Sequence, residues 1–172
     1  MSPTLKALIA INIILILFSW FTFFYYYPKL PPKIPMHFDW KGNVDAWGKK
    51  ASSLVMLPAL QTILFIIFMI VSRFPKTFNF PGKEKIDLVP VDKKALVYDL
   101  LKEMLFFICL FVNLLFLYLL RMICLIGTGK PVIFNPVYLY SLILGVFLVA
   151  VYYLRKANFT IKELLKTASH IR

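Results

Sequence analysis

Residues 5–27 read LKALIAINIILILFSWFTFFYYY, an almost wholly apolar run of 23 residues. A helix needs about 20 apolar residues to cross the hydrocarbon core of a bilayer, so this run is long enough to span a membrane. It ends in aromatic residues and Pro28 rather than in a small-residue cleavage site, which argues against a signal peptide. We therefore predict an uncleaved transmembrane helix whose aromatic end lies at a bilayer interface.

Three further apolar runs predict three further spans. The composition agrees, because 60% of the residues are hydrophobic and only 16% are charged, whereas about a quarter are charged in soluble domains. The predicted fold is all-α: one integral membrane domain, residues 1–172, with four transmembrane helices, an extracellular turn-rich loop between helices 1 and 2, and an amphipathic cytosolic C-terminal helix. The expected segments are spans at about 5–27, 53–72, 103–126 and 136–154, an outer loop at 28–52, a cytosolic loop at 73–102 and a tail at 155–172.

The distribution of Lys and Arg predicts the orientation. Thirteen basic residues fall on the side that would hold both termini, and six fall on the other side. The positive-inside rule therefore predicts cytosolic termini and an outer loop outside the cell. This asymmetry and anionic lipids at the cytosolic face account for the net charge of +12, and no nucleic-acid-binding motif accompanies it, so we expect no nucleic-acid partner.

Polar residues predict details of the second span. Ser52 and Ser53 are candidate N-caps for its helix, and Pro58 lies in its first turns. Gln61 is the one amide side chain in this apolar run. An amide inside a span usually forms a hydrogen bond with a neighbouring helix, which we favour over a role in a transport path.

Two further capping signals lie near the predicted cytosolic face. Asp92 can cap an interfacial helix or a cytosolic extension of the third span, and Thr160 with Glu163 forms a capping box that would open a separate helix in the tail. This tail helix would lie on the membrane surface as an anchor to anionic lipids, or would bind a partner. Its apolar stripe consists of Ile161, Leu164, Leu165, Ala168 and Ile171.

The outer loop holds the polar and aromatic stretch IPMHFDWKGNVDAWGKK, residues 34–50. Apolar and polar residues alternate up to Gly42-Asn43, which predicts a short strand followed by a turn. One side would carry Ile34, Met36, Phe38 and Trp40, and the other Pro35, His37, Asp39 and Lys41. If the two limbs fold back at the turn, His37 or Asp39 comes close to Asp45.

These three residues offer two interpretations. His37, Asp39 and Asp45 could share a divalent cation, although three ligands without a metal-binding motif make a weak site. Alternatively, they tie the loop together through hydrogen bonds and ion pairs to Lys41, Lys49 or Lys50, and we favour this structural role. We therefore expect no cofactor and no metal.

A single charge, Arg121, lies inside an apolar run. It either reaches the lipid headgroups or pairs with Asp39 or Asp45 and pins the outer loop to the bundle. Trp40 and Trp47, with Phe38, form either a face for a hydrophobic peptide or lipid or a set of interfacial anchors. The candidate ligand- or partner-binding residues are His37, Phe38, Asp39, Trp40, Gly42, Asp45, Trp47, Lys49 and Arg121.

The loop resembles the domain-of-unknown-function family numbered 1648. Members carry Ile-Pro-x-His-Phe, then Gly, then Pro/Val-Asp-x-Trp/Tyr-Gly-x-Lys between their first two membrane helices; here the pattern reads Ile34-Pro35-Met36-His37-Phe38, Gly42 and Val44-Asp45-Ala46-Trp47-Gly48-Lys49-Lys50. The best-known member looks like the immunity protein against the sporulation-delaying protein toxin of bacilli, a receptor and signal protein. The resemblance implies a prokaryotic plasma-membrane protein with the loop outside. The second motif of those immunity proteins, Asn-x-x-x-Gly-x-Arg-x-x-x-Thr, is not found after Lys94.

We carry three hypotheses for function. The first is a membrane protein that is not an enzyme and binds a ligand or protein partner through its outer loop, as a receptor, immunity or regulatory protein. The second is an accessory subunit of a larger transporter or membrane enzyme complex. The third is a small channel or carrier that uses Gln61, Asn113 and Arg121. The sequence leaves the oligomeric state open.

Overall fold

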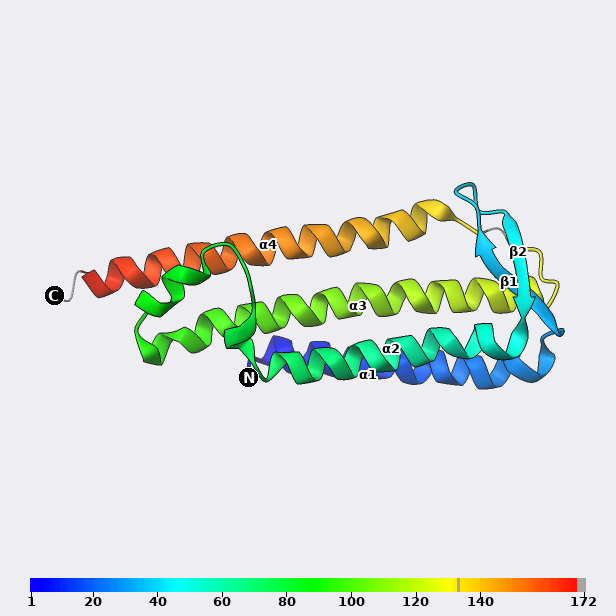
Figure 1. The fold of residues 1–172 in the computed structure, drawn as a ribbon, viewed down its shortest axis with the longest axis horizontal. Helices are drawn as coiled ribbons and strands as arrows, with labels where there is room; N and C mark the ends of the chain where they lie inside the picture. Colours follow the sequence, from blue (N-terminus) through cyan, green and yellow to red (C-terminus); the bar gives the residue numbers. More distant parts are fainter. Residues whose placement is uncertain (133, 170–172) are drawn as a thin grey trace.

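The computed structural model describes residues 1–132 and 134–169, apart from the side chains of residues 51–53 and 169. Within this part the chain folds into long α-helices, one two-stranded sheet and short 3-10 helices (Figure 1). In chain order the elements are α1 (Pro3–Tyr26), η1 (Tyr27–Lys29), β1 (Lys33–Phe38), β2 (Val44–Lys49), α2 (Lys50–Ser72), η2 (Pro75–Thr77), η3 (Lys83–Leu88), η4 (Val91–Lys93), α3 (Lys94–Gly127) and α4 (Pro136–Ser169).

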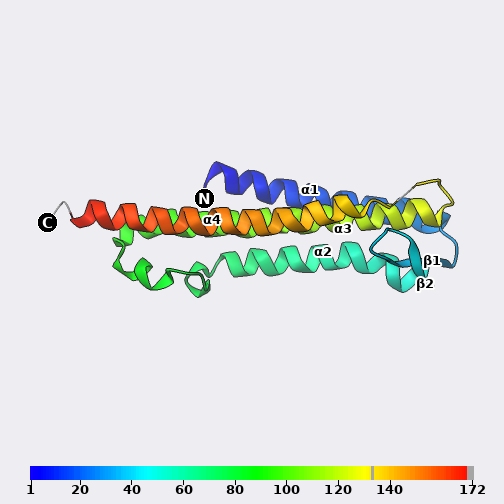
Figure 2. The same ribbon diagram turned by 90° about the horizontal axis from the view of Figure 1, so that it is seen from above.

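The four α-helices run side by side in one elongated bundle (Figures 1 and 2). Helix α3 is central, because α1, α2 and α4 all pack against it. The strands lie at one end, here called the hairpin end, and the N-terminus and the end of α4 lie at the other, here called the terminal end. Each of the four helices is long and apolar enough to cross a membrane, which confirms the predicted four-span architecture.

Helix α1 is capped as its first residues suggest. The Oγ of Ser2 accepts a hydrogen bond from the Leu5 amide at 3.1 Å, and Pro3 occupies the first turn, where its missing N–H leaves no bond unmade. The buried face of α1 carries polar residues, including Ser19 and Thr22, whose hydroxyls donate to carbonyls one turn back in the same helix. The exposed face is apolar and includes Ile14, Leu17 and Phe21. This reversed polarity suits a helix surrounded by lipid.

Three buried amide side chains join α1, α2 and α3 inside the bundle. Asn113 donates from Nδ2 to Oδ1 of Asn12 at 2.8 Å, and Asn12 donates to the Phe106 carbonyl at 3.1 Å. Gln61 donates from Nε2 to the Asn113 carbonyl at 2.8 Å. The predicted interhelical bond of Gln61 is therefore confirmed.

Helices α3 and α4 are longer than predicted. Helix α3 begins at Lys94, so the expected cytosolic loop ends earlier than residue 102, and the extension of the third span is confirmed. Helix α4 continues to Ser169 without a break, so the separate tail helix predicted from Thr160 and Glu163 is wrong. No Pro or Gly interrupts residues 155–168, and each residue that continues a helix adds a hydrogen bond that a new start would forgo.

The predicted N-caps of α2 and α3 are also wrong. Helix α2 begins at Lys50, ahead of Ser52 and Ser53, and therefore shortens the expected outer loop. Helix α3 follows directly on η4, which contains Asp92, and its N-cap residue Lys93 makes no side-chain capping bond. Helix α2 follows β2 directly and α3 follows η4 directly, so the preceding element, and not a capping side chain, sets where each helix begins.

The terminal end has its own apolar core. The loop between α2 and α3 folds over α3 and the last turns of α4, as the green segment in Figure 1 shows. The tail stripe expected at the membrane surface belongs to this core, because Ile161 is only 1% exposed. Leu164 and Leu165 pack against it, and Ile171 lies outside the described residues. The core consists of Phe80, Ile86, Val89, Val97, Leu101, Ala157 and Ile161.

Candidate functional site

Strands β1 and β2 form a hairpin, so the predicted strand and turn are confirmed and the second limb is a strand as well. They pair antiparallel, with Ile34 opposite Gly48 and Pro35 opposite Trp47. The strict alternation expected for β1 is not found, because Ile34 and Pro35 are both buried while Met36 and His37 are both exposed. The pairing is also irregular between Pro35 and His37, which leaves Met36 as an extra residue.

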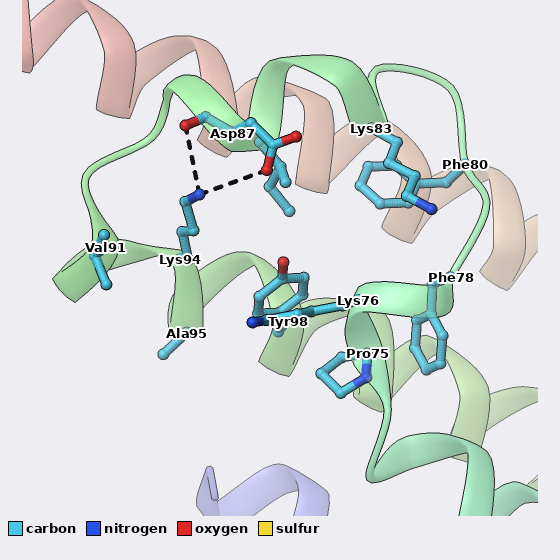
Figure 3. Close-up of a pocket in the computed structure, with 11 residues that line it drawn as sticks. Pro75, Lys76, Phe78, Phe80, Lys83, Asp87, Val91, Lys94, Ala95 and Tyr98 are labelled. Carbon is cyan, nitrogen blue, oxygen red and sulfur yellow. Dashed lines mark hydrogen bonds and ion pairs between the residues drawn. The ribbon is translucent and has the colours of Figure 1, made fainter.

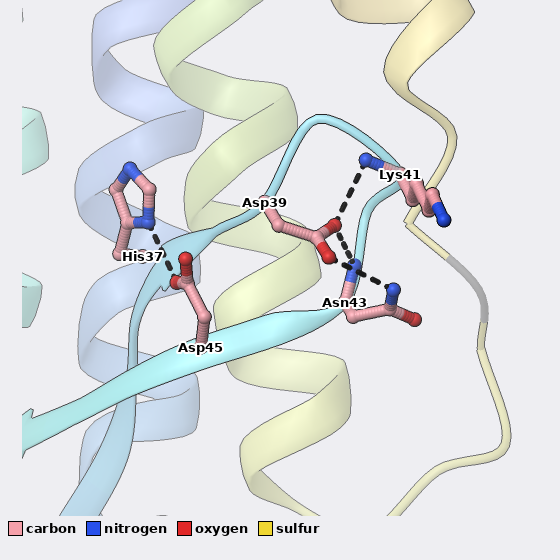
Figure 4. A network of polar contacts seen from close by, with 5 residues as sticks. All are labelled: His37, Asp39, Lys41, Asn43 and Asp45. Carbon is pink, nitrogen blue, oxygen red and sulfur yellow. Dashed lines mark hydrogen bonds and ion pairs between the residues drawn. The ribbon is translucent and has the colours of Figure 1, made fainter.

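Asp39 organises the turn (Figure 4). Its Oδ1 accepts hydrogen bonds from the backbone amides of Lys41 and Asn43, each at 2.8 Å, and its Oδ2 accepts one from the Asn43 side chain at 3.0 Å. Gly42 completes the turn at φ +91°, where a residue with a Cβ is disfavoured. The bond from the Asn43 side chain, followed by those from the backbone amides, holds the pKa of the Asp39 carboxyl below its ordinary value.

His37 and Asp45 face one another across the hairpin, as predicted. The His37 Nδ1 lies 2.6 Å from the Asp45 Oδ1, and both side chains are solvent-exposed (Figure 4). Asp39 is bound instead within its own turn. The three candidate metal ligands are therefore not brought together, and among the described residues no three His, Cys, Asp or Glu side chains gather around one point.

Lys50 ties the base of the hairpin to α1. Its Nζ donates to the carbonyl of Tyr27 at 3.1 Å and to that of Leu30 at 2.8 Å, where α1 and η1 end. A cation is favoured at a helix C-terminus, because the last carbonyls lack partners there. Lys50, one of the three lysines considered as partners of the loop carboxylates, therefore bonds to backbone carbonyls instead.

An aromatic stack joins the hairpin to α3 and to the start of α4. The rings of Phe38 and Phe134 are stacked with centroids 4.4 Å apart, and Tyr118 of α3 contacts Phe134 at 5.4 Å. The Tyr118 hydroxyl accepts from the Asn135 amide at 2.7 Å. Gly42 completes the contact, because a Cβ there would lie 2.5 Å from the Phe134 carbonyl oxygen.

Beneath this stack lies a cavity of about 450 Å³ at the hairpin end. Its walls come from the hairpin and from α2, α3 and α4, and most of them are apolar. Trp40 stands at its edge with 73% of its surface exposed. The lining residues are Met36, His37, Phe38, Asp39, Trp40, Leu57, Leu119, Ile123, Phe134, Pro136, Leu139 and Tyr140.

The predicted binding residues fall into two groups. The cavity is lined by His37, Phe38, Asp39 and Trp40. Gly42 and Asp45 do not line it but contact residues that do, Gly42 at Phe134 and Asp45 at His37. Trp47, Lys49 and Arg121 do not line it.

Arg121 lies elsewhere on the bundle, beside α1. It is exposed and lines a separate cavity of about 220 Å³ with Phe18, Phe21, Thr22, Tyr25 and Tyr26. Asp39 and Asp45 have other partners, and among the described residues no ion pair joins Arg121 to either. Gln61 and Asn113 are buried together, so the three residues of the channel hypothesis do not share one site.

Sequence reasoning missed the walls of the cavity. Leu57, Leu119 and Phe134 come from segments far apart in the chain, and each reads as an ordinary apolar residue. The sequence holds one indication that Phe134 packs against another element: it is the sole aromatic residue between Gly127 and Asn135.

The comparison with known families decides what the hairpin segment is. Residues 14–62, from the middle of α1 through the hairpin into α2, match the family described as "Domain of unknown function (DUF1648)". The segment belongs to the DUF1648 family. This confirms the resemblance seen in residues 34–50. The DUF1648 segment includes the hairpin, its turn and Leu57, the cavity residue that α2 contributes.

The relationship to a curated protein covers only part of each chain. An "Uncharacterized protein" of the archaeon Archaeoglobus fulgidus is 32% identical over 90 residues, which cover 48% of this chain and 49% of that protein. The chain therefore spans about half the length of this curated relative. No solved structure matches. The chain thus contains a DUF1648 segment, has four helices long and apolar enough to cross a membrane, and has a prokaryotic relative.

Proposed function

We propose that this protein is a recognition protein of a prokaryotic plasma membrane, of the receptor, immunity or regulatory type, and that it binds an apolar segment of a partner polypeptide at the hairpin end. The observation that carries the proposal is the cavity of about 450 Å³ whose apolar walls converge from the hairpin and three helices. Ligand sites in proteins are typically concave, mostly apolar and equipped with a few polar groups. Here those polar groups are His37 and Asp39.

The exposed aromatic residues support a polypeptide as the ligand. Trp40 and Trp47 are 73% and 57% exposed. Tryptophan is enriched among the residues that dominate binding energy at protein interfaces. A cavity of this size accommodates a few apolar side chains, and Trp40 can close over them.

The polar groups of the hairpin support a function in binding rather than catalysis. The described histidine, His37, is bonded to Asp45, and within the described residues no hydroxyl or thiol is hydrogen-bonded to its ring. A nucleophile next to a base is the arrangement that acyl or phosphoryl transfer would need. We propose that the protein is not an enzyme, with the hairpin outside the cell and both termini in the cytosol, as the positive-inside rule favours.

Photo-crosslinking in living host cells tests this proposal. Benzoylphenylalanine replaces Trp40 at the cavity edge or, as a matched control on the same hairpin, Trp47, which does not line the cavity. We expect a discrete polypeptide adduct at Trp40 and a much weaker one at Trp47. Equal labelling at the two positions, or none at Trp40, would contradict a cavity-centred site. Stoichiometric copurification of the adduct partner in mild detergent would instead identify an accessory subunit of a larger complex.

A further inference from the structure

A second cavity, of about 490 Å³, lies at the terminal end of the bundle (Figure 3). It is formed by the short helices η2, η3 and η4, which connect α2 to α3, and by the first turns of α3. It therefore belongs to none of the elements that build the hairpin site. Its lining residues are Pro75, Lys76, Phe78, Phe80, Lys83, Ile86, Asp87, Val91, Lys94, Ala95 and Tyr98.

The cavity carries an excess of positive charge. Three lysines line it and only one carboxylate, Asp87. Lys94 uses that carboxylate, since its Nζ lies 3.6 Å from the Asp87 Oδ1 and 3.4 Å from the Asp87 carbonyl oxygen. Lys76 and Lys83 reach the cavity from η2 and η3 (Figure 3), and neither has an ion pair with a described carboxylate. Two uncompensated ammonium groups favour an anionic ligand.

The rest of the wall is apolar, so a small inorganic anion would leave most of the cavity unfilled. Phe78, Phe80 and Tyr98 present aromatic rings, and Ile86 and Val91 add aliphatic surface. A ligand that complements the whole cavity therefore combines an anion with hydrocarbon. Apolar groups gain free energy in proportion to the area that they remove from water.

The position of the cavity identifies the source of such a ligand. The apolar span of α2 ends at Ser72, and the cavity wall begins three residues later at Pro75. Between them, Phe74 is 58% exposed, as expected for an aromatic residue at a bilayer interface. A bilayer whose boundary coincides with the end of the α2 span would therefore have this cavity at the level where lipid headgroups meet the acyl chains. Phospholipids with a net negative charge are the anionic amphiphiles of that layer.

We propose that this cavity binds one anionic phospholipid, with its phosphate held by Lys76 and Lys83 and the start of an acyl chain against Phe78 and Tyr98. The lipid site lies on the loop, whereas the tail that the sequence suggested as a lipid anchor is packed into the terminal core. The proposal does not depend on the function of the hairpin end, and it holds for either orientation in the membrane.

Native mass spectrometry of the full-length protein in a neutral detergent tests the proposal. The probes are phosphatidylglycerol, phosphatidylcholine with the same acyl chains, and inorganic phosphate. The test variant is the double substitution Lys76→Gln and Lys83→Gln. Its matched control, Lys85→Gln with Lys93→Gln, removes the same charge from the same loop at positions that do not line the cavity.

We expect one tightly bound phosphatidylglycerol per protein, at least about tenfold preferred over phosphatidylcholine, because each lysine near an anionic headgroup strengthens binding severalfold. The test variant should lose most of this preference, and the control should keep it within about twofold. An equal loss of this lipid preference in the two variants would overturn the site, because it would show that the general positive charge of the loop binds the lipid. Displacement of the lipid by millimolar phosphate would overturn the lipid assignment, and persistence of the complex would support it.

Discussion

Asn113 donates a hydrogen bond to Asn12 across the α1–α3 interface, with 2.8 Å between Nδ2 and Oδ1. Both side chains are almost fully buried, at 1% and 0% exposure. In a bundle with hydrocarbon on its outer faces, lipid competes equally for apolar surface, so interhelical hydrogen bonds and close packing set how the helices pair. The position of α1 against α3 therefore depends on these two amides.

A double-mutant cycle tests this dependence. Asn12→Ala, Asn113→Ala and their combination should show a coupling free energy of about 0.6 kcal/mol, with an upper bound near 1.7 kcal/mol for bonds of this kind. The free energy of unfolding is measured by SDS titration in mixed micelles. Ser19→Ala serves as the control partner, because the Ser19 hydroxyl bonds only to its own helix, at the Leu15 carbonyl. Coupling between Ser19 and Asn113 as large as that of the amide pair would contradict the assignment.

The orientation can be read from cysteine labelling in intact cells. Trp47→Cys should react with a membrane-impermeant maleimide, whereas Lys85→Cys in η3 should react only after the cells are opened. The native Cys109 and Cys124 give little background, because they are 1% and 0% exposed. The reverse pattern would place the hairpin in the cytosol.

Gly42 and Gly129 give a matched pair for the fit of the hairpin. Both have positive φ, +91° and +75°, so an alanine at either costs about 1–2 kcal/mol of backbone strain. At Gly42 the new Cβ would also meet the Phe134 carbonyl, whereas at Gly129 it meets nothing within 4 Å. Gly42→Ala should therefore destabilise the protein more, by about 1–3 kcal/mol. Thermal unfolding in detergent measures the difference between the two variants. Equal destabilisation by the two substitutions would show that Phe134 moves aside at no cost in stability.

The turn should be sensitive to acid through Asp39. Its folded-state pKa is lowered, so ionised Asp39 stabilises the turn fully above its ordinary pKa of about 3.9. That stabilisation is lost as the pH falls through the lower folded-state value. The Asn43 amide resonance, followed by NMR from pH 6 to pH 2.5, should stay constant to about pH 4 and then shift. Asp39→Asn should abolish the transition, and a midpoint above 3.9 would rule out the proposed cause.

The four spans and the hairpin could be predicted because their signals are local. Hydrocarbon runs of membrane length identify helices without knowledge of their neighbours. Gly42 and Asn43 identify a turn, and the turn alone brings His37 near Asp45. Chemistry that depends on positions only a few residues apart is readable from the chain.

Features that depend on distant segments could not be predicted. Thr160 and Glu163 form a sound capping box in isolation, but contacts with the α2–α3 loop hold α4 helical through them. The walls of the hairpin cavity come from several elements, and Leu57, Leu119 and Phe134 become neighbours only when those elements pack. Arg121 shows the same limit, because the face of α3 on which it lies directs it away from the hairpin.

The uninterrupted length of α4 has a mechanical consequence. The helix starts at the cavity wall formed by Pro136, Leu139 and Tyr140, and some 50 Å later it ends beside the terminal core. Because α4 lies along α3 as one unbroken helix, a tilt of about 5° about its hairpin end would displace its far end by about 4 Å. Such a tilt would also move Ala157 and Ile161 against the loop packed on them, so one rigid element joins the two ends of the bundle.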